Sequence, residues 1–256
     1  MTPVVYTGVS DHWHEDYERG RPGWPAEAVD VPGVPPAATV LELGAGTGKL
    51  TRLLARKFER VIAVEPDAGM RRLFVENCPD VELLDAGAEE IPLAADSVDA
   101  VFAAECFHVF DVEPAIAEIT RVLRPDGTLV LMWNVPGGPT EPSIAAVEQM
   151  LRRRAPEDLL YDPVDLNSTR YASGELLAPF ADSPFDELEH ACLTNPQTID
   201  RDGVFAFLAS MGWLSDLPDE ERLPLLEQVR AMLPAPEYRR RWETHVHWAR
   251  LATRSR

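Results

Sequence analysis

Short apolar runs alternate with helical patterns through the first half of the chain. Residues 40–43 form an apolar run that suits a buried parallel strand, and apolar side chains recur at helical spacing from Leu50 to Phe58. The alternation continues with strands expected at residues 61–64, 81–84, 98–103 and 128–133, and with helices around Met70 and over residues 116–123. This order of elements indicates an α/β architecture with a largely parallel sheet.

The two ends of the chain have different patterns. Helices are expected at residues 143–154, 173–180, 204–213 and 219–232, and partly alternating strands at residues 185–193 and 244–251, the last with the character of an edge strand. Residues 1–36 contain six prolines and four aromatic residues, and they sustain no period beyond one short helix near residues 11–19. We therefore expect an N-terminal arm that precedes the folded core.

Composition narrows the class of protein. The chain has 256 residues, a formal net charge of -19 and an isoelectric point near 4.6. This length suits one large α/β domain with an insertion, and the negative field argues against nucleic acid or a membrane surface as partner. Three cysteines without metal or redox spacing, no signal-peptide pattern and no run of 18 apolar residues favour a cytoplasmic protein, which we expect to be a monomer or homodimer.

A glycine-rich turn follows the first expected strand. Residues 42–48 read Glu-Leu-Gly-Ala-Gly-Thr-Gly, and a helical pattern begins at Leu50. Glycine permits positive φ and close approach of a ligand to the main chain, and the free N–H groups at a helix start can bind that ligand. The turn is therefore a candidate binding site for a small molecule.

The spacing of the turn discriminates between ligands. A dinucleotide fingerprint would need its third glycine at position 49, which is lysine, and a phosphate loop would need glycine at position 43 and Ser or Thr at position 50, which are both leucine. The Glu42 carboxylate at the mouth of the turn would repel a pyrophosphate, but it suits a ligand that carries an ammonium and a sulfonium group. S-adenosylmethionine meets that description.

Residues 42–48 resemble motif I of the class I S-adenosylmethionine-dependent methyltransferases, and within them the small-molecule, type 11-like enzymes. The similarity continues in the family's order and spacing at residues 64–66 (Val-Glu-Pro), 88–93 (Ala-Glu-Glu-Ile-Pro-Leu), 107–111 (Phe-His-Val-Phe-Asp) and 123–127 (Leu-Arg-Pro-Asp-Gly). It covers residues 12–135 well and the C-terminal half loosely.

The resemblance implies a fold and a division of the chain. The fold would be a Rossmann-like, seven-stranded, mostly parallel α/β sheet with helices on both faces, an antiparallel last strand, an N-terminal arm and helical insertions. Residues 1–36 would form an arm or lid. Residues 37–256 would form a single methyltransferase domain with helical insertions at about 139–182 and 200–235.

The resemblance also implies roles for individual residues. Glu65 ends the second strand, where its carboxylate would accept hydrogen bonds from both ribose hydroxyls of the cofactor. Residues 17–25 resemble the segment that covers the cofactor in related enzymes, so the Tyr17 hydroxyl would lie near the carboxylate or the methyl group of the cofactor and Arg21 would pair with the methionine carboxylate; the alternative is an arm packed for stability alone. The expected cofactor-binding residues are Tyr17, Arg21, Glu42, Gly44, Ala45, Gly46, Gly48, Glu65, Pro66, Met70, Gly87, Ala88, Glu89 and Glu105.

Two residues are candidates for catalysis. His108 follows the fourth strand, and an imidazole with its ordinary pKa near 6.5 could take a proton from an acceptor; the alternative is that His108 only orders its loop. The Tyr17 hydroxyl is the second candidate. We also expect Trp133 and Asn134 at the rim of the site.

The leading hypothesis is a methyltransferase that uses S-adenosyl-L-methionine, yields S-adenosyl-L-homocysteine, and acts on an oxygen, nitrogen or carboxylate of a small molecule. The alternatives are a catalytically silent S-adenosylmethionine-binding regulatory domain and, with less support, a dinucleotide-dependent oxidoreductase. His245 and His247 would share one strand face, but the sequence offers no third ligand within reach, so we expect no metal.

Overall fold

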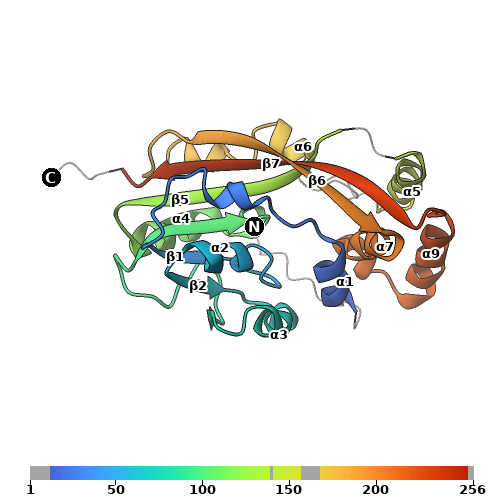
Figure 1. Cartoon of the computed structure of the whole chain (residues 1–256), viewed down its shortest axis with the longest axis horizontal. Helices are drawn as coiled ribbons and strands as arrows, with labels where there is room; N and C mark the ends of the chain where they lie inside the picture. Colours follow the sequence, from blue (N-terminus) through green and yellow to red (C-terminus); the bar gives the residue numbers. More distant parts are fainter. Residues whose placement is uncertain (1–11, 139–140, 157–167, 253–256) are drawn as a thin grey trace.

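A seven-stranded sheet runs through the molecule in the strand order β3-β2-β1-β4-β5-β7-β6 (Figure 1). The computed structural model describes residues 12–138, 141–156 and 168–252. The strands are β1 (Thr39–Leu43), β2 (Arg60–Val64), β3 (Glu82–Leu84), β4 (Val98–Ala104), β5 (Leu123–Pro136), β6 (Glu189–Asp200) and β7 (Glu237–Arg250). Strands β1 to β5 pair in parallel, and β7 is antiparallel to both of its neighbours, which confirms the expected fold class.

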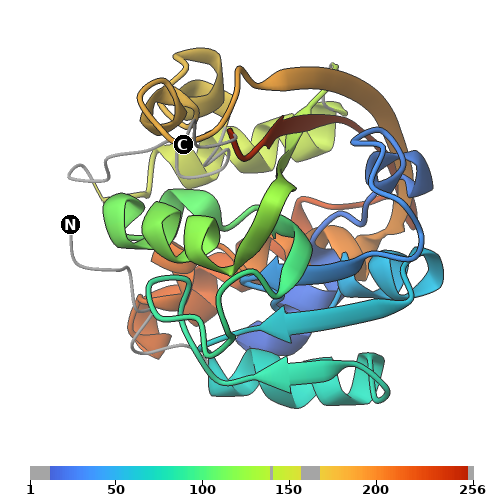
Figure 2. The same cartoon turned by 90° about the vertical axis from the view of Figure 1, so that its left-hand side faces the viewer.

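Helices cover both faces of the sheet. They are α1 (Trp13–Gly20), α2 (Thr51–Lys57), α3 (Ala68–Asn77), α4 (Val112–Val122), α5 (Pro142–Arg152), α6 (Ser168–Ala172), α7 (Arg201–Ala209), α8 (Gly212–Ser215) and α9 (Asp219–Ala231), with 3-10 turns η1 (Ala26–Val29), η2 (Phe107–Val109) and η3 (Ala178–Phe180). Figure 2 shows α4 on one side of the sheet, and η1 and α2 on the other. Among the described helices, none combines the length and the apolar character that a membrane crossing requires.

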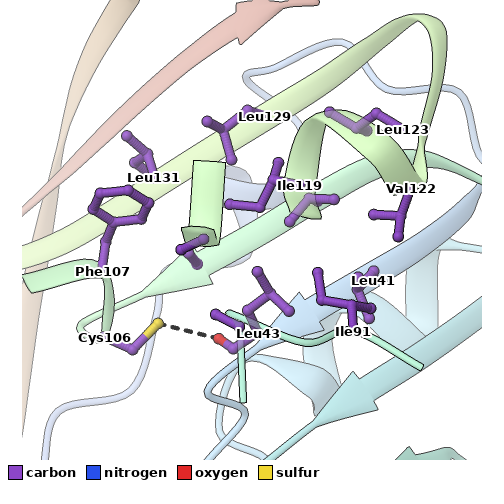
Figure 3. Packing of buried hydrophobic residues seen from close by; sticks show 14 of the residues in the cluster. Leu41, Leu43, Ile91, Cys106, Phe107, Ile119, Val122, Leu123, Leu129 and Leu131 are labelled. Atoms are coloured by element: carbon purple, nitrogen blue, oxygen red, sulfur yellow. Dashed lines mark hydrogen bonds between the residues drawn. The ribbon is translucent and has the colours of Figure 1, made fainter. Parts of the chain in front are cut away.

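Alternating side chains of the central strands fill two cores. Leu41 and Leu43 of β1 pack with Ile119 of α4 on one face, as Figure 3 shows, whereas Val40 packs with Leu54 of α2 on the other. All five side chains are fully buried. Burial of each such side chain stabilises the fold by about 1.5–3 kcal/mol, so the strand that leads into the glycine-rich turn is held rigidly from both sides.

A third core lies in the C-terminal half. Apolar side chains of α5, α7, α8 and α9 pack together with Tyr238 and Trp242 of β7. Figure 1 shows the long strands β6 and β7 reaching from the sheet to α7 and α9. Helices on both sides of β6 in the sequence therefore form one cap beside the carboxyl ends of the parallel strands.

The two C-terminal strands differ from their expected form. Strand β7 is interior, because it pairs with β5 on one side and β6 on the other, so the expectation of an edge strand at residues 244–251 was wrong. The edge strand is β6, which continues to Asp200 rather than ending at Leu193. Residues 194–198 of this strand are polar apart from Pro196, a residue that sheets tolerate at an edge. They therefore lack the alternation of apolar and polar residues by which pattern analysis detects a strand.

The short helix expected at residues 173–180 was also misplaced. Helix α6 ends at Ala172, and turns follow it as far as the 3-10 turn η3. Gly174 has φ +77°, a left-handed conformation that interrupts a helix. The expected loop at residues 162–168 lies outside the described residues apart from Ser168, which begins α6.

Candidate active site

A cavity of about 710 Å³ opens beyond the carboxyl ends of the parallel strands. Open α/β sheets bind ligands at this edge, and the volume falls within the range of about 300–1,000 Å³ that is usual for small-molecule sites. All the residues expected to bind the cofactor or to act in catalysis line this cavity except Gly48, and of the two residues expected at the rim Asn134 lines it and Trp133 does not. The fold thus brings expected residues from several segments of the first half of the chain together around this cavity.

The three glycines of the turn all have positive φ, of +60° at Gly44, +57° at Gly46 and +87° at Gly48. A β-carbon at Gly46 would have nothing closer than the Tyr17 ring at 4.0 Å, so this position faces open space in the cavity. A β-carbon at Gly48 would lie 2.6 Å from the Cys78 sulfur. Gly48 is therefore needed for the packing of the turn against α3. It does not line the cavity, and its expected part in binding the cofactor stays a prediction.

Glu65 stands at the end of β2 with a buried side chain. Its carboxylate accepts hydrogen bonds from the backbone N–H of Gly46 at 2.7 Å and of Asp67 at 2.9 Å. Burial raises the pKa of Glu65, and these two N–H groups oppose that shift. Because a carboxylate has about four acceptor sites, the two bonds leave capacity for two hydroxyl groups, which fits the ribose of the cofactor.

Glu42 lies buried on β1 at the mouth of the turn, where it accepts a 2.5 Å hydrogen bond from the Thr51 hydroxyl. Burial raises the pKa of Glu42 to about 8. A cation placed beside such a carboxyl favours its ionised form. The residue is therefore suited to a ligand that brings an ammonium group into this part of the cavity.

Glu105 follows β4 with φ +57°, a conformation that non-glycine residues rarely adopt. Its carboxylate accepts a 2.6 Å hydrogen bond from the backbone N–H of Asn134, at the end of β5. Strained backbone of this kind concentrates at functional sites, and here it joins the ends of two neighbouring strands on the cavity wall.

One end of the cavity is lined by Pro66, Met70, Gly87, Ala88 and Glu89. The Glu89 carboxylate accepts a 2.9 Å hydrogen bond from the backbone N–H of Asp111, and a β-carbon at Gly87 would lie 2.7 Å from its other oxygen. The absence of a side chain at Gly87 therefore makes room for the Glu89 carboxylate.

His108 lies in η2 with a half-buried side chain at the cavity wall. Its Nδ1 atom is buried and has no hydrogen-bond partner among the described residues. Burial, and secondarily the charges of Arg170 and Arg21, lower the pKa of His108 to about 4. The imidazole is therefore neutral at pH 7 and is a weaker base than an ordinary histidine.

The arm crosses the cavity and is anchored at both sides. The Arg21 guanidinium donates to the Ser210 hydroxyl at 3.0 Å and to the Ser210 carbonyl at 2.9 Å, just after α7. On the other side, the Glu18 carboxylate accepts from the Thr47 hydroxyl and from Arg52 at 3.0 Å, beside the glycine-rich turn. Arg21 has five N–H donors, so these bonds are compatible with the expected carboxylate contact, which stays a prediction.

Burial keeps the Tyr17 hydroxyl protonated by raising its pKa well beyond the ordinary value.

The far end of the cavity is built by residues that sequence reasoning did not assign to the site. They come from α5, α7, α8 and β7 and their flanks, namely Glu148, Arg152, Phe207, Ser210, Met211, Gly212, Trp213, Arg240 and Trp242. The Arg240 guanidinium lies over the rings of Phe207 at 4.2 Å and Trp242 at 4.7 Å, and its Nη2 atom is 3.4 Å from Glu148. No motif marks these residues, because they meet only when the cap folds onto the sheet.

Trp133 and Asn134, the two residues expected at the rim of the site, point to opposite faces of β5. Asn134 lines the cavity, but Trp133 is fully buried on the opposite face of β5, where its ring packs beside Tyr171 and His247. Consecutive strand residues point to opposite faces of a sheet, so only one of the two could reach the site.

The family model of a methyltransferase domain matches residues 41–131 of the chain. An uncharacterised methyltransferase of Schizosaccharomyces pombe is 32% identical over 214 residues, which cover 81% of this chain and 80% of the relative. An uncharacterised methyltransferase of Mycobacterium tuberculosis is 48% identical over 118 residues, or 46% of this chain and 49% of the relative. The match thus spans about half the length of the mycobacterial protein.

A solved structure from Anaeromyxobacter dehalogenans, provisionally described as a type II methyltransferase, is similar over 91% of this chain and 98% of its own, with 27% identity and a TM-score of 0.66. A methyltransferase of Haloferax volcanii, solved in complex with its Trm112 activator, has the same fold at 18% identity and a TM-score of 0.52. Together with the glycine-rich turn, the acid at the end of β2 and the strand order, these matches show that the chain belongs to the class I S-adenosylmethionine-dependent methyltransferases.

Proposed function

We propose that this protein transfers the methyl group of S-adenosylmethionine to a carboxylate oxygen of a small organic acid. The observation that carries this proposal is the pair of arginines, Arg152 and Arg240, at the far end of the cavity, and the pKa of His108, which burial lowers to about 4 on the cavity wall, agrees with it. A general base works best when its pKa lies near the operating pH, and the protonated Tyr17 hydroxyl cannot serve as one. The acceptor atom should therefore be one that carries no proton at neutral pH.

The bound cofactor would supply an electrophilic methyl group on a sulfonium, and the residues of the chain would hold and align the reactants. Glu42 and Glu65 would bind the ammonium and ribose groups, and Gly46 would leave space for the ligand. A carboxylate loses its proton at much lower pH than a phenol or an ammonium group, so it needs no catalytic base at pH 7. Alignment and exclusion of water are then sufficient for transfer.

The far end of the cavity supports a small acceptor with an apolar body and a negative charge. Three aromatic side chains line it, those of Phe207, Trp213 and Trp242, and two arginines accompany one glutamate there, Arg152 and Arg240 with Glu148. The resulting positive excess favours an anion, and guanidinium groups pair well with carboxylates.

The test is a panel of carboxylic acids, phenols and amines with S-adenosylmethionine labelled in its methyl group. We expect transfer to carboxylic acids, with product label that is released by mild alkali as expected of a methyl ester. We expect kcat to be flat between about pH 6 and 8, because His108 stays neutral above its pKa of about 4 and the acceptor is already ionised. If His108 were the general base, activity would fall only below about pH 4, so the pH profile does not separate the two roles. The variant His108→Ala does: we expect less than about 10-fold loss of kcat, whereas removal of a general base lowers kcat about 100- to 10,000-fold.

The acceptor end has its own matched pair of variants. Arg152→Gln should raise the acceptor KM about 10-fold or more, since hydrogen bonds to charged groups contribute about 1.5–3 kcal/mol, while Arg153→Gln, the exposed neighbour that does not line the cavity, should leave KM unchanged. Alkali-stable label on phenols or amines, with acids unmethylated, would refute the carboxylate acceptor.

The arm is proposed as a lid over the cofactor, rather than as a segment that packs only for stability. Its contacts to Thr47, Arg52 and Ser210 support this role, because they join the glycine-rich turn to the cap across the cavity. Glu18→Ala should accelerate dissociation of S-adenosylhomocysteine about 10-fold by removing charged hydrogen bonds, and Glu27→Ala, exposed on η1, should not. Stopped-flow dissociation rates that are unchanged both in Glu18→Ala and in a chain lacking residues 1–25 would refute the lid.

A further inference from the structure

The face of the β6–β7 pair that points away from Trp242 and Thr244 carries side chains that commonly bind metals. Cys192 and His245 are opposite each other in the register of the two strands, and Glu243 lies two residues from His245 on β7, hence on the same face. His190 and His247 form the next opposite pair. Pattern analysis singled out only His245 and His247: Cys192 and His190 come from a strand about 50 residues away, and Glu243, although on the same strand, belongs to no metal-binding motif.

Three donor atoms of this face form a triangle. The His245 Nε2 atom is 4.0 Å from the Cys192 sulfur and 3.9 Å from a Glu243 carboxylate oxygen, and all three donors lie within 4.8 Å of one another. With two sides of about 4 Å and a third of at most 4.8 Å, the point equidistant from the three atoms lies no more than about 2.5 Å from each, close to the distances of about 2.0–2.3 Å at which Zn²⁺ binds thiolate, imidazole and carboxylate. Among the described residues, this is the group of donors with such spacing.

A hydrogen bond orients the imidazole for this use. The Tyr171 hydroxyl of α6 lies 2.8 Å from Nδ1 of His245, on the opposite side of the ring from Nε2. Metal-bound histidines characteristically engage their second ring nitrogen in this way, which fixes the tautomer and the ring plane. The same hydroxyl is 2.8 Å from Nε2 of His247, so Tyr171 is itself held in place.

The triangle is accessible to ions from solvent. Cys192 is exposed and Glu243 is half-buried, while the His245 side chain is only 13% exposed. None of the three residues lines the active-site cavity. An ion bound here would have three protein ligands and an open fourth position, and it would join the edge strand β6 to the interior strand β7.

We propose that Cys192, Glu243 and His245 form a binding site for a divalent transition-metal ion of the zinc type, with Tyr171 as the positioning residue. Binding requires the thiolate, so the Cys192 proton is released to solvent as the ion enters. The site is separate from the methyl-transfer cavity, and the proposal holds whatever the methyl acceptor is.

Titration of the chelator-treated protein with Co²⁺ alone tests the proposal, because a cobalt–thiolate bond gives a strong near-ultraviolet charge-transfer band. We expect one Co²⁺ per chain with this band, and displacement of the ion by Zn²⁺. Cys192→Ser should abolish the band, and Tyr171→Phe should retain it while weakening affinity about 10- to 100-fold, as loss of a hydrogen bond to a metal ligand commonly does. Thr198→Ala, an exposed change on the same strand that is six residues from Cys192 and opposite Arg239, should change neither.

Since Cys192 is exposed, its replacement should leave the fold intact, and circular dichroism checks this for each variant. Absence of a thiolate band with Co²⁺ in molar excess would overturn the site. Retention of full Co²⁺ affinity in Cys192→Ser would also overturn it, by assigning the ion to the neighbouring histidines instead.

Discussion

Gly46→Val is expected to reduce affinity for S-adenosylmethionine and S-adenosylhomocysteine at least about 100-fold. A side chain at this position would enter the cavity, since a β-carbon there meets nothing closer than the Tyr17 ring at 4.0 Å. Isothermal titration calorimetry with both compounds measures the loss directly. With valine at this position, the ligand must either give up its contacts to the turn or displace the turn. Either change loses several charged or neutral hydrogen bonds, which contribute about 0.5–3 kcal/mol each.

The matched control separates obstruction from backbone strain. Gly46 has φ +57°, so valine also brings a conformational penalty of about 1–2 kcal/mol. Gly33 has φ +68° with no atom within 4 Å of its β-carbon position, and it does not line the cavity. Gly33→Val should therefore lower the melting temperature by a similar amount and leave affinity unchanged. Normal affinity in Gly46→Val would show that the turn is only a connector.

Glu65→Ala is expected to weaken cofactor binding by about 30- to 1,000-fold. This corresponds to about 2–4 kcal/mol for a pair of buried, charge-assisted hydrogen bonds to the two ribose hydroxyls. The fold should suffer as well, because the carboxylate also accepts hydrogen bonds from the backbone of Gly46 and Asp67. Thermal unfolding without ligand measures that second effect separately.

A ligand lacking the hydroxyls isolates the ribose contact. The 2′,3′-dideoxy analogue of S-adenosylhomocysteine should bind the native protein weakly, and Glu65→Ala should cost it little further affinity. The double-mutant cycle then gives the coupling energy between carboxylate and hydroxyls, independent of any loosening of the turn. Equal losses for the two ligands would place the role of Glu65 in holding the turn, and would refute direct recognition of ribose.

The sequence by itself determined the parts of the molecule whose chemistry depends on local spacing. The apolar run at residues 40–43 and the glycines after it predict a strand and a turn with positive φ, Glu42 places an acid at the mouth of that turn, and Glu65 marks the end of the next strand. Parallel strands end at a common edge, so these residues could be placed together before any contact was known. The mostly parallel sheet followed from the order of elements, and its antiparallel closure was implied by the resemblance to the methyltransferase family.

Other features were decided only by the tertiary structure, because they depend on residues distant in the chain. Arg152, Trp213 and Arg240 reach the cavity through packing of the cap, and no local pattern distinguishes them from surface or core residues. The pKa of His108 is set by burial, which changes a candidate base into a weak one. Strand β7 became interior because the polar edge strand β6 pairs beside it, and that pairing alone brought Cys192 opposite His245. Spacing along the chain determines which groups a turn presents. Long-range packing determines which residues surround each group and how far water reaches it, and these two factors set its pKa and reactivity.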